Sequence, residues 1–243
     1  MKEFIKISLN EFKALRFYAL ISLGVTLLTY SIFFIDKEAF HRLNFEDGLV
    51  ENLTALCLLI TSLCFLKLFF MTRNMINLLF CVAFMFGCGE EISWGQRLLN
   101  FETPESVMTI NRQGEFNIHN LSIFNATNEK GAPKPILKRI MNPGALFILF
   151  GFSYLLLYPF LFNGFRIIRI IGQSIGLLTP PLLFGLLFLT NYLIYKFVGS
   201  FTAARNVRFG ESFEFIAVFL FAFLALYFVR NFKAVAVATF RPG

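Results

Sequence analysis

The chain has 243 residues, of which 57% are hydrophobic and 15% charged, and its formal net charge is +7. Soluble domains carry about 25% charged residues. The mean hydropathy here is +0.68, so the composition excludes an ordinary soluble globular protein. The positive charges are spread over loops and termini. This argues against nucleic-acid binding and is typical of the cationic flanks of membrane helices. The sequence therefore predicts an all-α integral membrane protein.

The apolar runs define the expected membrane-spanning segments. A helix needs about 20 apolar residues to cross ~30 Å of hydrocarbon. Such runs predict one transmembrane domain, 1–243, built as a bundle of about six helices. Their expected bounds are 17–35, 49–70, 75–98, 145–162, 174–198 and 213–229, with Pro180 and Pro181 expected to kink the fifth. Residues 1–16 carry an apolar stripe between lysines and are expected to form a short interfacial helix.

Loop charge predicts the orientation of the bundle. Six crossings place both termini on one side, together with the second and fourth loops. Lys and Arg are more frequent there than in the short first and fifth loops. The positive-inside rule therefore predicts cytoplasmic termini in the inner (plasma) membrane. The first and fifth loops, and the long polar loop 99–141 between helices three and four, then share the non-cytoplasmic face.

Acidic residues that interrupt the apolar pattern gather at this second face. They come from three different helices: Glu51 opens the second, Glu90 and Glu91 lie near the end of the third, and Glu211 and Glu214 open the sixth. A carboxylate at the depth of Glu90 costs at least ~2.5 kcal/mol on insertion scales. We therefore expect it to face the interior of the bundle and to have a partner, with loop 99–141 covering the site.

Two interpretations of this cluster are ion pairing and metal binding. In the first, Glu90 or Glu91 forms ion pairs that hold helices together, but carboxylates outnumber cations, so the excess must be protonated, hydrated or bound to a cation. In the second, the carboxylates bind a divalent metal, with Glu51, Glu211 and Glu214 as supporting ligands. The chain has only two histidines, which excludes a site with three His ligands.

The third interpretation is metal-free acid–base chemistry. Glu90, Glu91 and His119 would be the catalytic groups, because adjacent carboxylates, one of them protonated, can donate and accept protons. The residues expected to bind an anionic headgroup are Arg97, Arg205, Arg208 and Asn120.

Aromatic and small residues surround the carboxylate pair. Trp94 is the only tryptophan, and the aromatic belt at a membrane interface is sufficient to explain it. Gly87, Gly89 and Gly95 would permit close helix packing or a local break in the helix.

Two strings carry a resemblance to other proteins. GEEISWGQRLLNFETPE (89–105) and NRQGEFNIHN (111–120) are similar to segments of uncharacterised bacterial multi-pass membrane proteins that share GEExSWGQR and QGExNxHN. The resemblance implies a multi-pass membrane protein, and no activity is attached to it.

We expect an integral membrane enzyme, a hydrolase or transferase, that acts on a lipid or lipid-linked substrate at the non-cytoplasmic face. The alternative is a non-enzymatic membrane protein, either a cation-binding channel or carrier or a subunit of a membrane complex. The expected partner is membrane lipid, and a partner membrane protein or a second copy of the chain is left open.

Overall fold

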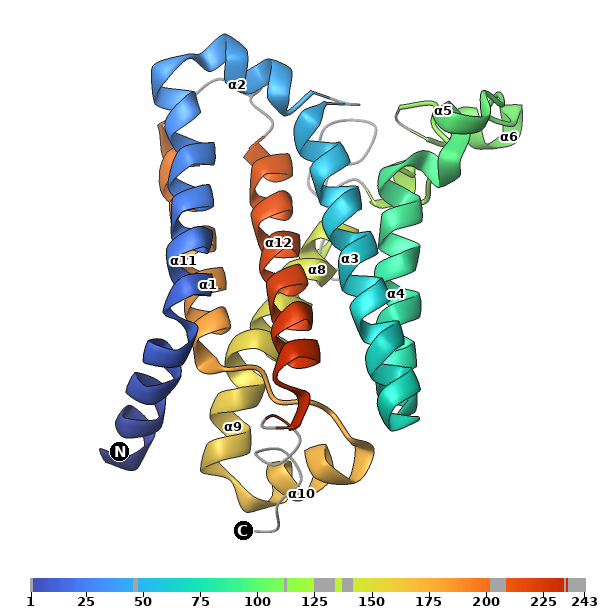
Figure 1. Ribbon diagram of the computed structural model, residues 1–243. Coiled ribbons are helices and arrows are strands. Elements are labelled where there is room, and N and C mark those ends of the chain that lie inside the picture. Colours follow the sequence, from blue (N-terminus) through green and yellow to red (C-terminus); the bar gives the residue numbers. More distant parts are fainter. Residues whose placement is uncertain are drawn as a thin grey trace.

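The protein is described here by a computed structural model that covers residues 2–45, 48–111, 113–124, 134–136, 142–201, 209–233 and 235, with side chains omitted for 2–14 and 97–98. It is a bundle of long helices (Figure 1). In chain order these are α1 (Lys2–Ile35), α2 (Lys37–Leu43), α3 (Leu49–Thr72), α4 (Met75–Glu91), α5 (Gln96–Leu99), α6 (Glu105–Met108), α8 (Pro143–Gly151), α9 (Tyr158–Gly164), α10 (Arg166–Ile175), α11 (Leu182–Ser200) and α12 (Phe209–Arg230). Short segments of other helix types are η1 (Ser93–Gly95), η2 (Ser122–Phe124) and the π-helical η3 (Phe152–Leu157).

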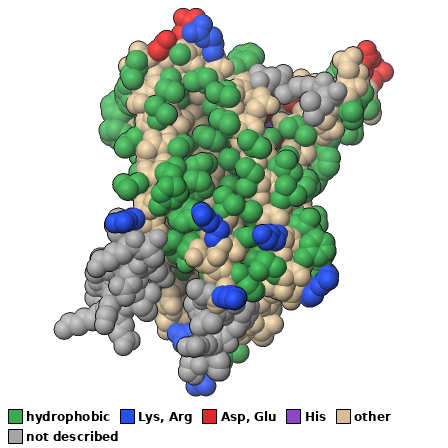
Figure 2. Space-filling model, viewed as in Figure 1, with side chains coloured by type: hydrophobic (Ala, Val, Ile, Leu, Met, Phe, Trp, Pro, Cys, Tyr) green, Lys and Arg blue, Asp and Glu red, His purple; other side chains and the backbone are tan. Residues whose placement is uncertain are grey.

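The long helices alternate in direction, so both termini lie at one end of the bundle (Figure 1). Within the described residues, five segments are long and apolar enough to cross a membrane: Leu15–Ile35, Leu49–Thr72, Pro143–Gly164, Leu182–Ser200 and Phe209–Arg230. The helix α4 has 17 residues, which is at the lower limit of membrane-crossing length. Apolar side chains cover most of the visible surface of these helices (Figure 2). The chain is a multi-pass membrane protein.

The central helix of the bundle is α12, which packs against α1, α3 and α11. Its residues Ala217, Leu224 and Phe228 are completely buried by the surrounding helices. A buried polar contact also joins three helices: the Tyr30 hydroxyl donates to Asn191 Oδ1, and Asn191 Nδ2 donates to the carbonyl oxygen of Phe213. These bonds satisfy polar groups inside an otherwise apolar core.

The hairpin of α3 and α4 is formed by local signals in the sequence. Arg73 adopts a left-handed conformation (φ 55°) that ends α3, and its N–H donates to the carbonyl oxygen of Phe69. The side chain of Asn74 then caps the N-terminus of α4 by accepting from the N–H of Ile76. The two helices run antiparallel along their length (Figure 1).

Two predicted helix boundaries and one predicted kink are wrong. The third segment, predicted as 75–98, ends at Glu91, because the backbone turns left-handed at Ser93, Trp94 and Gly95. The fifth, predicted as 174–198, begins only at Leu182. Pro180 and Pro181 do not kink that helix but precede it, and residues 166–175 form the separate helix α10.

The N-terminal prediction is correct about helix but wrong about its separation from the first span. Residues 1–16 were expected to form a short helix of their own, whereas α1 runs without interruption from Lys2 to Ile35. Residues 1–16 contain neither proline nor glycine, the two residues that most disfavour a helix. The helix therefore continues into the apolar run.

Candidate functional site

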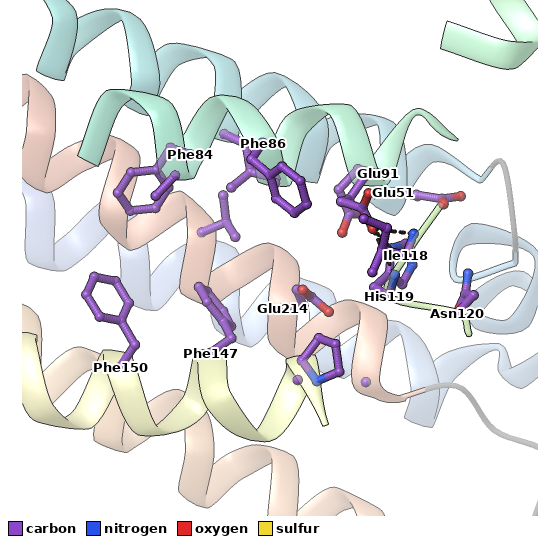
Figure 3. Close-up of a pocket in the computed structure, with 18 of the residues that line it drawn as sticks. Glu51, Phe84, Phe86, Glu91, Ile118, His119, Asn120, Phe147, Phe150 and Glu214 are labelled. Carbon is purple, nitrogen blue, oxygen red and sulfur yellow. Dashed lines mark hydrogen bonds and ion pairs between the residues drawn. The ribbon is translucent and has the colours of Figure 1, made fainter. Parts of the chain in front are cut away.

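A cavity of about 860 Å³ lies between helices α3, α4, α8 and α12. It is near the end of the bundle opposite the termini, where part of the loop that follows α4 closes it (Figures 1 and 3). Gln113, Ile118, His119 and Asn120 are the lining residues from this loop. The cavity therefore lies between four helices and a polar cover.

One end of the cavity is acidic. Glu51 from α3, Glu90 and Glu91 from α4, and Glu211 and Glu214 from α12 all line it. In the described part of the chain, neither Glu91 nor Glu214 makes a hydrogen bond or an ion pair. Because carboxylates so close together repel one another when ionised, this end favours the uptake of protons or of a cationic group.

The other end of the cavity is apolar and aromatic. Phe84 from α4 and Phe147 and Phe150 from α8 form its walls (Figure 3). The ring of Phe84 packs against that of Phe150, with centroids 6.5 Å apart. A lipid chain or another apolar group would fit such walls, and a hydrated ion would not.

The cavity also reaches the lateral surface of the bundle. Leu79, Ala83 and Phe86 are spaced at i, i+4 and i+7 on α4, so they share one helix face. All three line the cavity and all three are exposed. This stripe, which we name the α4 mouth (Leu79, Ala83 and Phe86), opens the apolar end of the cavity toward the surrounding lipid.

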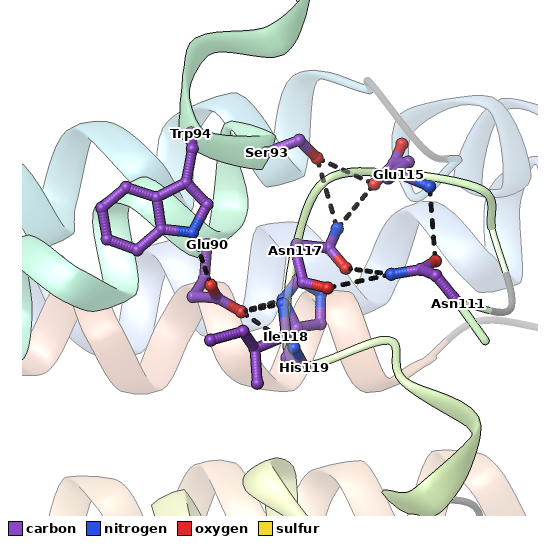
Figure 4. A network of polar contacts seen from close by, with 8 residues as sticks. All are labelled: Glu90, Ser93, Trp94, Asn111, Glu115, Asn117, Ile118 and His119. Atoms are coloured by element: carbon purple, nitrogen blue, oxygen red, sulfur yellow. Dashed lines mark hydrogen bonds and ion pairs between the residues drawn. The ribbon is translucent and has the colours of Figure 1, made fainter. Parts of the chain in front are cut away.

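Glu90 holds the loop in place over the cavity (Figure 4). The residue as a whole is only 5% exposed. One oxygen, Oε1, accepts from the Trp94 indole N–H at 2.6 Å, and the other, Oε2, accepts from the backbone N–H groups of Ile118 at 2.7 Å and His119 at 2.8 Å. The imidazole Nδ1 of His119 lies 3.4 Å from the same Oε2. Both oxygens of Glu90 are thus engaged in positioning the loop.

The left-handed turn after α4 makes this arrangement possible. Ser93 and Trp94 have φ values of 46° and 55°, which are unfavourable for residues with a side chain. The turn directs the indole back over Gly89, where a Cβ atom would lie 2.9 Å from the ring. Glycine at this position therefore makes room for Trp94 to reach Glu90. The strained turn is offset by the hydrogen bond that it allows.

A second polar network secures the same loop to the turn (Figure 4). The Ser93 hydroxyl and the Asn117 amide both donate to Glu115 Oε2, at 2.9 and 2.7 Å. The Asn111 amide donates to the backbone and side-chain oxygens of Asn117, each at 2.9 Å. Gln96 adds a further bond by accepting from the N–H of Phe116. Residue 111 and residues 113–120 of the loop thus form a defined cover.

His119 is the histidine of this cover. Burial by itself would lower its pKa, but the contact with Glu90 and the negative charges of Glu214, Glu90 and Glu211 outweigh that effect and raise the pKa above the ordinary value. The charged imidazole is therefore stabilised relative to that of a free histidine. It faces the same acidic groups that line the space below it.

The structure brings together most of the residues predicted from sequence. The cavity is lined by Glu51, Glu90, Glu91, His119, Asn120, Glu211 and Glu214. Arg205 and Arg208 lie outside the described residues, as does the side chain of Arg97. Among the residues that are described, no three His, Cys, Asp or Glu side chains are close enough to hold one metal ion.

Sequence reasoning missed several residues that shape the site. Trp94 was assigned to the aromatic belt, yet its indole is a hydrogen-bond donor to Glu90. Ser93, Asn111 and Asn117 were not weighed as parts of one network. The available signal was the i, i+4 spacing of Glu90 and Trp94, together with the density of Asn and Gln in 111–120.

No family model, no curated protein and no solved structure matches the chain.

Proposed function

We propose that the chain is a membrane enzyme, a hydrolase or transferase, that acts on a lipid or lipid-linked molecule held in this cavity. The observation that carries the proposal is that one cavity has an apolar, aromatic end and an acidic end. Aromatic walls at one end suit an acyl or polyprenyl chain, and carboxylates beside an imidazole at the other suit proton transfer to a polar head. The α4 mouth offers such a molecule a route from the bilayer.

The proposed chemistry uses His119 and the carboxylates that face the cavity. Glu91 or Glu214, as the carboxylate, accepts the proton of a water molecule or an acceptor hydroxyl as its oxygen attacks the ester. His119 donates a proton to the leaving oxygen as the old ester bond breaks, a role that its raised pKa favours. Glu90 is a positioning residue, because its oxygens already accept three hydrogen bonds.

The distribution of charge supports a non-cytoplasmic site. More of the described Lys and Arg side chains lie toward the end of the bundle that holds the termini than toward the other end. The first group is Arg16, Lys67, Arg73, Arg166, Arg169, Arg230 and Lys233, and the second is Lys37, Arg42, Lys134 and Lys196. The cavity, with its carboxylates, lies toward the opposite end. Under the positive-inside rule this arrangement favours cytoplasmic termini and a site at the other membrane face.

A turnover experiment tests the proposal. The purified protein is reconstituted in vesicles of phosphatidylethanolamine, phosphatidylglycerol and cardiolipin, and the lipids are followed by mass spectrometry over time. We expect a new product with the wild type, and none with His119→Asn or Glu214→Gln. Glu105→Gln, on the exposed helix α6, serves as the control and should leave turnover unchanged. Lipid that stays bound without turnover in all variants would favour the non-enzymatic alternative.

Occupation of the cavity is tested separately by filling it. Ala83→Trp places an indole in the α4 mouth, and Val82→Trp places the same group on the neighbouring exposed position, which does not line the cavity. Native mass spectrometry should show fewer retained lipids for Ala83→Trp than for Val82→Trp. Equal retention by the two variants would contradict lipid binding in this cavity.

A further inference from the structure

Helix α10 (Arg166–Ile175) presents an apolar face to its surroundings. It lies across the end of the bundle that holds the termini (Figure 1), away from the cavity. Ile167, Ile170, Ile171 and Ile175 fall on one side of the helix, and each is between 46% and 67% exposed. Four isoleucines on one short helix make an apolar strip that no described part of the protein covers.

The opposite side of α10 is attached to the protein. Arg169 donates from Nε to the carbonyl oxygen of Phe162 at 3.2 Å and from Nη2 to that of Asn163 at 3.1 Å, which satisfies carbonyls at the end of α9. Gly172 packs against Tyr158, where a Cβ atom would overlap the hydroxyl. The helix is therefore docked through the side that carries its arginine and glycine.

The far end of α10 is fixed as well. Asn74, in the turn between α3 and α4, donates from Nδ2 to the carbonyl oxygens of Gly176 at 2.7 Å and Ile175 at 3.3 Å. The helix is thus held at both ends with its isoleucines directed outward. A helix on the surface of a soluble protein has the reverse orientation, with its apolar side toward the core.

The charge around α10 is positive. Arg166 is exposed at its first position, and Arg73, Arg230 and Lys233 lie at the ends of neighbouring helices at the same end of the bundle. None of the described side chains at this end is acidic, and lysine and arginine side chains are visible there in Figure 2. Such a surface complements phosphate groups with a net negative charge.

We propose that α10 is an interfacial helix that inserts its isoleucine strip at the boundary of the acyl chains and binds anionic phospholipid headgroups through Arg166. An apolar strip beside cationic residues is the combination that places a helix in the plane of a membrane interface. This site is separate from the cavity, so it does not depend on the function proposed for the cavity.

The first test measures lipid selectivity. The protein is placed in nanodiscs of phosphatidylcholine with a minor fraction of phosphatidylglycerol, and lipids that remain bound are counted by native mass spectrometry. Arg166→Gln should reduce the enrichment of phosphatidylglycerol by about fivefold, the effect expected of one cation near an anionic leaflet. Lys37→Gln, an exposed lysine at the opposite end in α2, is the matched control. No reduction for Arg166→Gln, or an equal reduction for Lys37→Gln, would overturn the headgroup assignment.

The second test measures the depth of the isoleucine strip. A bimane label on Ile171→Cys should be quenched by lipids brominated on their acyl chains and protected from aqueous iodide. The same label on Arg166→Cys should show the opposite preference, because that position belongs to the headgroup level. An Ile171 label that iodide quenches as freely as the Arg166 label would place the strip in water and refute the interfacial helix.

Discussion

Replacing Glu90 by glutamine separates the positioning of the loop from chemistry in the cavity. The carboxylate of Glu90 accepts hydrogen bonds from the Trp94 indole and from the backbone N–H groups of Ile118 and His119. A glutamine side chain has one acceptor oxygen in place of two. Either the Trp94 indole N–H or the backbone N–H groups of Ile118 and His119 then lose their acceptor. The new amide N–H group of the glutamine points at donors with which it cannot form a hydrogen bond.

The expected loss of stability follows from these bonds. A buried donor left without an acceptor costs about 1–3 kcal/mol, and bonds to a charged acceptor are worth more than neutral ones. We therefore expect Glu90→Gln to lower the free energy of unfolding by about 2–4 kcal/mol. Glu91→Gln is the matched control, because in the described structure Glu91 makes no hydrogen bond or ion pair. It should change stability by less than about 1 kcal/mol, or increase it by removing charge repulsion.

Two measurements follow the change. The thermal unfolding midpoint in detergent reports on stability, and the emission of Trp94, the only tryptophan, reports on its surroundings. Hydrogen exchange of the amides of Ile118 and His119 should become faster in Glu90→Gln and remain slow in Glu91→Gln. If the two variants unfold at the same temperature and exchange these amides equally, Glu90 does not hold the loop and our account of the cover is incorrect.

Three further predictions concern charge, packing and orientation. The pKa of His119 is raised in the fold, so protonation of His119 stabilises the folded state. This stabilisation should be complete below about pH 6.5 and should disappear as the pH rises through the pKa of the folded state. The difference in melting temperature between wild type and His119→Asn should therefore vanish in alkaline buffer. Gly89→Ala should destabilise the fold by about 1–3 kcal/mol and shift the emission of Trp94, since the added methyl group would lie 2.9 Å from the indole ring. Gly87→Ala is the control and should have little effect, because the nearest atom to its methyl group would be 3.4 Å away. Cysteine placed at Glu38 should react with impermeant reagents from outside the cell and cysteine at Lys233 only after lysis; labelling of both from one side would contradict the orientation.

Hydropathy predicted the order of the long apolar helices because apolar length is a local property of the sequence. Of the six predicted segments, five are long and apolar enough to cross a membrane in the described structure, and the third, α4, has 17 residues. Hydropathy failed where tertiary contacts set the boundary. The run from Met75 to Leu98 is apolar enough to look like one helix, but the turn at Ser93 and Trp94 ends it, and that turn depends on bonds to Glu90 and to loop 111–120. In the same way, Pro180 and Pro181 are compatible with a kink or with a helix start, and the hydropathy of their neighbours does not distinguish the two.

The sequence predicted which helix ends form the site, but not the contacts that each side chain makes there. Alternation of helix direction places Glu51, Glu91 and Glu214 at the same end of the bundle, and the cavity indeed collects them. The different roles of Glu90 and Glu91 could be assigned only from the structure. Adjacent residues on a helix point about 100° apart, so the sequence shows that the two carboxylates face different surroundings. Only the packing of loop 111–120 decides that Glu90 binds the backbone of that loop while Glu91 is left facing the cavity, where a substrate or a proton would meet it.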